Sequence, residues 1–195
     1  MVSVAKGRPA TGRDLDGLAD NVVGEILAGE LHVSPRPASR HALASSALGS
    51  DLFGKFHRPA GGGGGGWWSL DEPALELGDD TLVAELAGWR RERMPIVPDA
   101  PTFTLAPDWV CEVLSSSTAR IDRMLKLPLY LRAGVSHVWL VDPIAEALET
   151  LRRTADGWLV IGVYGVDMKM RAPPFDHSEI DLARLWDRGE RSSSS

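Results

Sequence analysis

Two carboxylates of this sequence lie inside apolar stretches, where a charged side chain is unusual. Glu85 interrupts the run 82–87, and Glu112 interrupts the run 109–114. A buried carboxylate is costly unless it is paired, protonated or bound to a metal ion. Because side chains alternate between the two faces of a strand, either glutamate could also face water from the edge of a sheet. The pattern alone leaves both alternatives open.

A polar stripe follows Glu112 along the next expected helix. Asp122, Lys126 and Tyr130 are spaced four residues apart, so they lie on one side of a helix. A strand that carries Glu112 and a helix that carries Lys126 can bring both groups to one cleft. The alternative is a solvated helix face with an Asp–Lys pair, and the spacing does not separate the two.

Together these groups have the chemistry needed for metal-dependent hydrolysis of a phosphodiester. Two carboxylates on neighbouring strands can hold a divalent cation through oxygen ligands. The cation polarises a phosphate and lowers the pKa of a bound water. A nearby lysine can orient that water or neutralise the charge that develops on the phosphorus group.

Strands and helices must position these side chains, and the apolar periodicity and turn signals predict them along the chain. Their order indicates an α/β or α+β fold with a mixed central sheet. The expected strands are 22–27, 30–33, 68–70, 75–77, 81–86, 109–114, 137–141, 147–152 and 158–164. The expected helices run from an N-cap at Ser39 to about Phe56, from Ala119 to about Ala133 with a kink at Pro128 and a stop at Gly134, and from Ile180 to Trp186.

Length and composition limit the class of protein. The chain has 195 residues and a formal net charge of −6, so we expect one domain over 1–190, a disordered tail over 191–195, and no general affinity for phosphate backbones. One cysteine, Cys111, excludes an internal disulfide and suits a reducing cytoplasmic setting. No apolar run is long enough to suggest a membrane span. The glycine run 61–66 lacks the Lys-Ser or Lys-Thr of a phosphate-binding loop and is expected to be a flexible connection.

Several motifs occur in the order found in a known family. They are the run Asp108–Thr118, then Asp122, Lys126 and Tyr130, then Gly134–Pro143, together with Gly29–Leu31, Ser34–Pro37, His41, Trp67–Pro73 and Gly78–Arg90. This set resembles the Uma-type restriction endonucleases of the PD-(D/E)XK nuclease superfamily, and the resemblance covers nearly the whole chain.

The resemblance implies a restriction-endonuclease-like α/β core, in which a mixed central sheet is flanked by helices and carries metal-binding acids on adjacent strands. Glu112 matches the second acid of the pattern, and Lys126 matches a lysine that has moved from the strand to the following helix. Glu85 stands where the family has the Asp of a Pro-Asp pair, so Ala84-Glu85 is a departure that bears on activity. The expected metal is Mg²⁺ or Mn²⁺, bound by Glu85 and Glu112.

Three functions follow from these residues. The first is an endonuclease that hydrolyses DNA, with Glu85, Glu112 and Lys126 as catalytic residues, while Asp122 and Tyr130 position Lys126 or contact substrate. The second is a catalytically degenerate member of the family that acts as a binding or assembly module. The third is a phosphohydrolase for nucleotides, and a basic groove lined by residues such as Arg120, Arg123 and Arg132 would instead favour a polymer.

Three further polar residues and the oligomeric state also bear on the site. Glu30 could approach the metal from the amino-terminal hairpin, and Glu72 could be structural or support the acids. His41 is expected to cap a helix or pack in the core rather than bind a metal. A homodimer is an expected assembly, because many nucleases pair two active sites to cut two strands and homodimers are the commonest oligomers.

Overall fold

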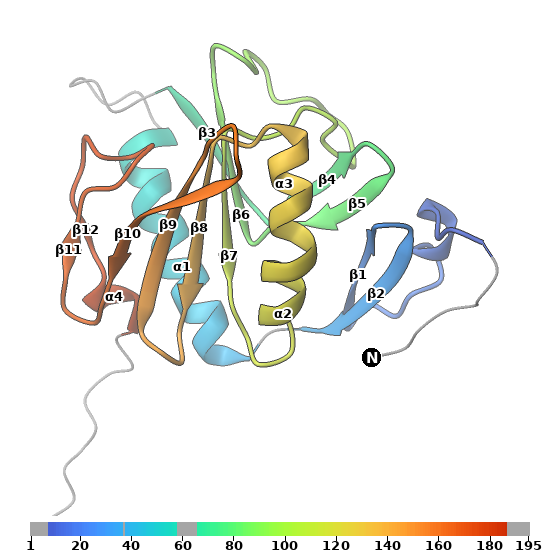
Figure 1. Cartoon of the computed structure of the whole chain (residues 1–195), viewed down its shortest axis with the longest axis horizontal. Helices are drawn as coiled ribbons and strands as arrows, with labels where there is room; N and C mark the ends of the chain where they lie inside the picture. The colour runs from blue at the N-terminus through green and yellow to red at the C-terminus, as the bar shows by residue number, and fades with distance from the viewer. Residues whose placement is uncertain (1–7, 37, 58–65, 187–195) are drawn as a thin grey trace, which may run out of the picture.

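The main body of the computed structural model, which describes residues 8–36, 38–57 and 66–186, is a six-stranded mixed sheet (Figure 1). The strand order is β10-β9-β8-β7-β6-β3. β7 and β8 run parallel, and the other neighbouring pairs run antiparallel. The predicted mixed sheet is therefore confirmed. Its strands are β3 (Trp67–Asp71), β6 (Leu86–Arg90), β7 (Trp109–Val113), β8 (His137–Asp142), β9 (Ala147–Arg153) and β10 (Trp158–Tyr164).

A smaller antiparallel sheet lies beside the main one, with the order β2-β1-β5-β4. Its first hairpin turns at Ala28 and Gly29, both of which have positive φ angles. Gly tolerates such angles, whereas Ala does so at a cost. The strands are β1 (Val22–Leu27), β2 (Glu30–Pro35), β4 (Ala74–Leu77) and β5 (Asp80–Val83).

The two sheets are connected where β5 ends and β6 begins. Ala84 and Glu85 lie between these strands, so the prediction of one strand over 81–86 is wrong. Leu82 and Ala84 are fully buried and pack with Ala87 in one core cluster. Because both sheets contribute to that cluster, the apolar run crosses from one sheet to the other without a polar turn signal.

Helices cover both faces of the main sheet (Figure 1). α1 (Ser39–Leu52) lies on one face, and the helical segment 119–133 lies on the other. Alternation along β7 sends Cys111 into the cluster on the α1 face and Val110 into the cluster on the opposite face. Glu112 is one residue after Cys111, so its side chain faces the second helical segment.

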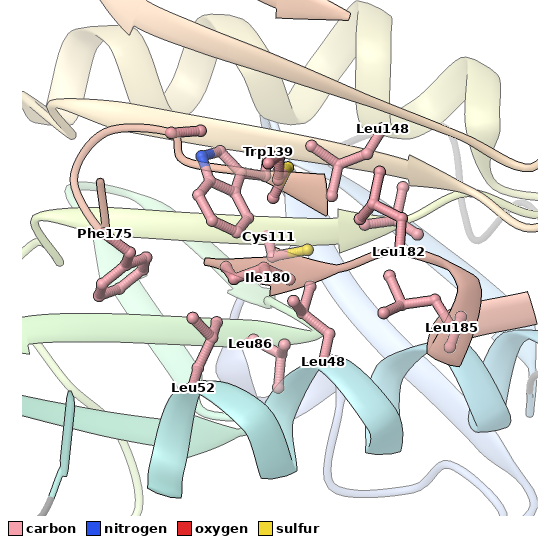
Figure 2. Packing of buried hydrophobic residues seen from close by; sticks show 14 of the residues in the cluster. Leu48, Leu52, Leu86, Cys111, Trp139, Leu148, Phe175, Ile180, Leu182 and Leu185 are labelled. Carbon is pink, nitrogen blue, oxygen red and sulfur yellow. The ribbon is translucent and has the colours of Figure 1, made fainter. Parts of the chain in front are cut away.

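The α1 face holds the larger aromatic part of the core (Figure 2). Leu48 and Leu52 of α1 lie beside Cys111 of β7, and Trp139 of β8 stands edge-on to Phe175. This packing holds α1 against the sheet. The carboxyl-terminal segment closes this core with Ile180, Leu182 and Leu185.

Helix boundaries agree with expectation in part. The predicted helix over 119–133 is present and ends at Gly134, whose φ is +89°. It consists of α2 (Ala119–Ile121), a π-helical turn (Asp122–Lys126) and α3 (Leu127–Ala133), with Pro128 in the first turn of α3. Pro lacks an N–H and disrupts the regular helical ladder, and the π-helical turn lies directly before the segment that contains Pro128.

Two other helix predictions need correction. Ser39 is the first residue of α1 and Ala38 is its N-cap, and a π-helical turn (Phe53–His57) continues α1. The predicted terminal helix starts later, because Ile180 and Asp181 instead form β12, which pairs with β11. Ile180 and its partner Met170 are both buried. The elements are β11 (Lys169–Met170), β12 (Ile180–Asp181) and α4 (Ala183–Trp186).

The expectations for the glycine run 61–66 and the tail 191–195 fall almost entirely outside the described residues, which include only Gly66 of the run. In the part of the chain that is described, no helix is long and apolar enough to cross a membrane.

Candidate active site

A cavity of about 230 Å³ opens where the smaller sheet meets the main sheet. Its lining includes one lysine and, besides Glu72 at the rim, four carboxylates from four separate parts of the chain. The acids come from β1, from the β5–β6 connection, from β7 and from the start of the helical segment after β7. These five residues are Glu25, Glu85, Glu112, Asp122 and Lys126.

Glu112 reaches the cavity from the centre of the main sheet. Glu112 is only 2% exposed, and the hydroxyl of Tyr130 donates a hydrogen bond to its Oε1. The Nζ atom of Lys126 lies 3.4 Å from the same oxygen. β7 places the carboxylate, and the polar stripe of the following helix supplies both partners.

Lys126 is held on several sides at once. Its Nζ lies 2.9 Å from Glu25 Oε1 and 3.6 Å from Asp122 Oδ1, and it donates to the carbonyl oxygen of Val83 at 2.9 Å. Asp122 and Lys126 are four residues apart and are both buried. A buried ammonium requires compensation of this kind.

This arrangement shifts the protonation of the buried groups. Burial raises the pKa of Glu112 to about 8, against the opposing effects of Lys126 and of the Tyr130 hydrogen bond. Burial also raises the pKa of Asp122. Burial on its own lowers the pKa of Lys126, but Glu112, Glu25 and Asp122 together raise it above the usual lysine range. The lysine therefore stays charged while the acids compete for it.

Glu85 enters the cavity from the connection between β5 and β6. The register pairs Leu86 with Cys111, so Glu85 lies next to the end of the ladder that carries Glu112. Its Oε1 is 3.1 Å from Nε2 of His41, in the first turn of α1. Its carbonyl oxygen accepts the N–H of Glu72, whose φ is +45°.

The structure brings four of the five predicted site residues to the cavity wall. Glu85, Glu112, Asp122 and Lys126 line it, whereas Tyr130 is fully buried behind Glu112 and contacts it through the hydroxyl. Glu112 lies in β7, and Glu85 directly precedes β6, the strand that pairs with β7. Glu85 therefore belongs to the connection between the two sheets and not to the interior of a strand.

Sequence reasoning missed Glu25 and considered Glu30 in its place. Glu25 is buried in β1, lines the cavity and pairs with Lys126. Glu30 is exposed, pairs with Leu27 at the turn of the hairpin and does not line the cavity. The signal was available, because Glu25 interrupts the apolar run 22–27 in the same way that Glu112 interrupts its own run.

The predicted basic groove of Arg120, Arg123 and Arg132 is not part of the cavity wall. Arg123 forms an ion pair with Glu149, and Arg132 lies 3.5 Å from Asp80. Arg36 does line the cavity.

Arg36 follows β2 and meets Glu72 at 3.4 Å, and both side chains are about half exposed. Exposed ion pairs contribute little to stability. An anionic ligand could therefore displace Glu72 from Arg36 at low cost.

Comparison with known proteins gives the context of this cavity. The Uma2 family, described as "Putative restriction endonuclease", matches residues 18–183. No curated protein matches the chain. A solved structure from Anabaena variabilis ATCC 29413, described as a "putative nuclease belonging to DUF820", is similar with a TM-score of 0.73 and 20% sequence identity. The similarity covers 91% of this chain and 98% of that one and shows a shared fold. The matched family spans every residue of the cavity wall, and the chain belongs to the Uma2 family.

Proposed function

We propose that this protein is a divalent-metal-dependent nuclease that hydrolyses the phosphodiester bonds of DNA at the cavity between the two sheets. The observation that carries the proposal is the convergence of Glu85, Glu112 and Lys126 on one cavity from three different elements. Membership of the Uma2 family supports the same reaction class.

The residues present fit a hard divalent cation. Five carboxylates line the cavity, against the two cations Lys126 and Arg36. Burial raises the pKa of Glu112 to about 8, so added positive charge would stabilise its ionised form. Within the described ranges, no group of three or more His, Cys, Asp or Glu side chains is arranged to hold a metal ion. Mg²⁺ is commonly bound by one or two carboxylates plus waters and substrate phosphates, and Glu85 and Glu112 would supply that pair.

When bound, Mg²⁺ or Mn²⁺ would polarise the phosphate and lower the pKa of a water molecule. Lys126 serves as a fixed positive charge, because its three acidic neighbours keep it protonated. It therefore neutralises charge that develops on the phosphate and does not remove a proton. Asp122 holds Lys126 from one side, and Tyr130 orients Glu112 from behind.

DNA is the proposed substrate, although the net charge of −6 gives the chain no general affinity for a phosphate backbone. Arg36 at the cavity wall is the proposed contact for a substrate phosphate. A homodimer would bring two such sites to two strands, and sedimentation analysis tests that assembly. The single thiol of Cys111, which is buried and free, suits a reducing cytoplasm.

One alternative has a specific observation in its favour. Both oxygens of Glu112 lie within 3.5 Å of Lys126, and Ala84-Glu85 replaces the Pro-Asp pair of the resembled pattern. A catalytically degenerate binding module could retain such a closed set of ion pairs. Titration calorimetry separates the two functions, because the module predicts no binding of Mn²⁺ at millimolar concentration.

The activity itself is tested by incubating supercoiled plasmid with Mg²⁺ or Mn²⁺ and each protein variant. The wild type and Glu30→Ala, an exposed control, should cleave the plasmid at equal rates. Glu112→Ala and Lys126→Ala should fall to the background rate. Equal cleavage by all four proteins would remove the assignment of the site, and no cleavage by any would favour the binding module.

A further inference from the structure

His41 is another buried polar residue in the cavity wall, and its contact there is with Glu85. Its Nε2 lies 3.1 Å from Glu85 Oε1, and the histidine is 6% exposed. Among the described residues, the Glu85 side chain has no other hydrogen bond or ion pair. The direction of this carboxylate therefore depends on His41.

Packing alone does not account for a histidine at this position. Its other ring nitrogen, Nδ1, is buried and has no hydrogen-bond partner among the described residues. A buried polar atom without a partner destabilises a fold, whereas an apolar side chain of similar size would avoid that cost. The histidine was expected to be a helix cap or a core residue, but the N-cap of α1 is Ala38, and the contact of the imidazole is with a site carboxylate.

Glu85 also needs such a partner more than an aspartate would. A glutamate has one more rotatable bond than an aspartate, and Ala84 restricts the backbone less than a proline does. The chain at 84–85 lies between two strands of different sheets, where no ladder continues through it. The contact with the imidazole of His41, which is anchored in α1, restricts this freedom.

We propose that His41 is a positioning residue, whose Nε2–H donates to Oε1 of Glu85 and directs that carboxylate toward the cation in the cavity. The inference rests on the proposed function, because the cation is part of it. Hydrogen-bond partners of metal ligands typically change metal affinity 10–100-fold when they are removed. His41 thus acts through Glu85 and does not itself bind the ion.

The test is titration calorimetry of the full chain with Mn²⁺, with thermal unfolding measured on the same samples. His41→Leu should bind Mn²⁺ at least about tenfold more weakly than the wild type, with an equal or higher Tm. His41→Gln, whose amide can donate from nearly the same place as Nε2, should bind within about threefold of the wild type. His177→Leu, an exposed control, should bind as the wild type does.

A double-mutant cycle then shows whether His41 acts through Glu85. In a Glu85→Gln background, His41→Leu should cause no further loss of Mn²⁺ affinity. Wild-type affinity in His41→Leu, or an equal loss in His41→Leu and His41→Gln without a change in Tm, would overturn the proposal. So would the same tenfold loss in the Glu85→Gln background.

A second readout separates this inference from the proposed function. Imidazole ¹⁵N spectra of the metal-free protein should show His41 with its proton on Nε2, and Glu85→Gln should shift that proton signal. A proton on Nδ1, or an unchanged signal in Glu85→Gln, would overturn the role of His41 without reference to any metal. A wild type that shows the expected spectra but binds no Mn²⁺ would refute the metal-dependent activity and, with it, positioning toward a cation.

Discussion

The ammonium group of Lys126 lies 2.9 Å from the carboxylate of Glu25. This ion pair joins the helical segment after β7 to β1, the first strand of the smaller sheet. The same carboxylate oxygen accepts the N–H of Val83 at 3.0 Å. Lys126 in turn donates to the carbonyl oxygen of Val83. These contacts fix the chain at Val83, two residues before Glu85, so the ion pair holds the junction between the sheets where the cavity lies.

Removal of Glu25 should therefore weaken the fold as well as the site. Glu25→Ala takes away one partner of a buried ion pair and leaves the Val83 N–H without its acceptor, so we expect a loss of about 3 kcal/mol in the free energy of unfolding. Glu25→Gln should lose less, because its amide oxygen can still accept from Val83. Urea denaturation measures both. Glu30→Ala, on the exposed turn of the same hairpin, should change stability by less than about 0.5 kcal/mol, and equal losses at the two positions would contradict this role.

Lys126 should contribute more to the free energy of unfolding at high pH than at low pH. Lys126→Met leaves Glu25, Glu112 and Asp122 buried without their cation, and such losses cost about 3–5 kcal/mol. The loss should be largest near pH 8 and smaller near pH 5. Burial raises the pKa of Glu112 and of Asp122, so these two acids take up protons at the lower pH and their repulsion is relieved. Chemical denaturation at the two pH values checks this, with Lys169→Met as an exposed control. A pH-independent loss would mean that repulsion among the acids is not its cause.

Protonation of Glu112 should give stability a defined pH dependence. Its pKa in the fold is raised to about 8 from an ordinary value of 4.5, so the folded state binds more protons than the unfolded state between these values. The contribution of Glu112 to the free energy of unfolding is therefore greatest below pH 4.5. It falls as the pH rises toward 8, by up to about 1.4 kcal/mol per pH unit. The pKa of Glu112 also depends on the four groups that face its carboxyl, which are Lys126, Asp122, Glu25 and Tyr130.

The measurement is the difference in unfolding free energy between the wild type and Glu112→Gln across pH 5–9. This difference should fall with rising pH, because the glutamine cannot ionise. Mn²⁺ affinity of the wild type should rise over the same range, since the ionised carboxylate is the ligand. A difference that is flat with pH would show that Glu112 is ionised throughout.

Tyr130 should affect stability and the pKa of Glu112 through its hydrogen bond to that carboxylate. Tyr130→Phe removes a buried hydrogen bond to a carboxylate and should cost about 1.5–3 kcal/mol of stability. It should also raise the pKa of Glu112 further, because that hydrogen bond lowers the pKa. Thermal unfolding and the pH profile above measure these effects. Tyr164→Phe replaces the other tyrosine of the chain and is the matched control. If the two variants behaved alike, the hydroxyl of Tyr130 would have no special role.

The sequence predicted the half of the site that has regular geometry. Strand alternation included a buried Glu112 among its two alternatives, and the four-residue spacing predicted that Asp122, Lys126 and Tyr130 would share one side of a helix. The resemblance to the nuclease family favoured the alternative in which these groups meet. Both patterns depend on local backbone periodicity, which survives even the π-helical turn over Asp122–Lys126. Membership of the family and the mixed sheet were predicted for the same reason, because the motifs occupy these regular elements.

The other half depends on contacts between distant segments. The crossing at Ala84 and Glu85 was hidden, because buried chain on both sides of it reads as one continuous strand. The pairing of Glu25 with Lys126 is set by how the first hairpin docks on the main sheet, which no local pattern encodes. The same is true of His41, whose partner on the β5–β6 connection becomes evident only once α1 is placed.

The proposed activity requires that Glu85 and Glu112 hold a divalent cation beside Lys126. The most direct measurement is a crystal structure of the wild type grown with Mn²⁺, with data collected at the manganese absorption edge. We expect an anomalous peak in the cavity, within bonding distance of one oxygen of Glu85 and one of Glu112. A peak at other residues, or none in the cavity at a Mn²⁺ concentration that supports DNA cleavage, would contradict it.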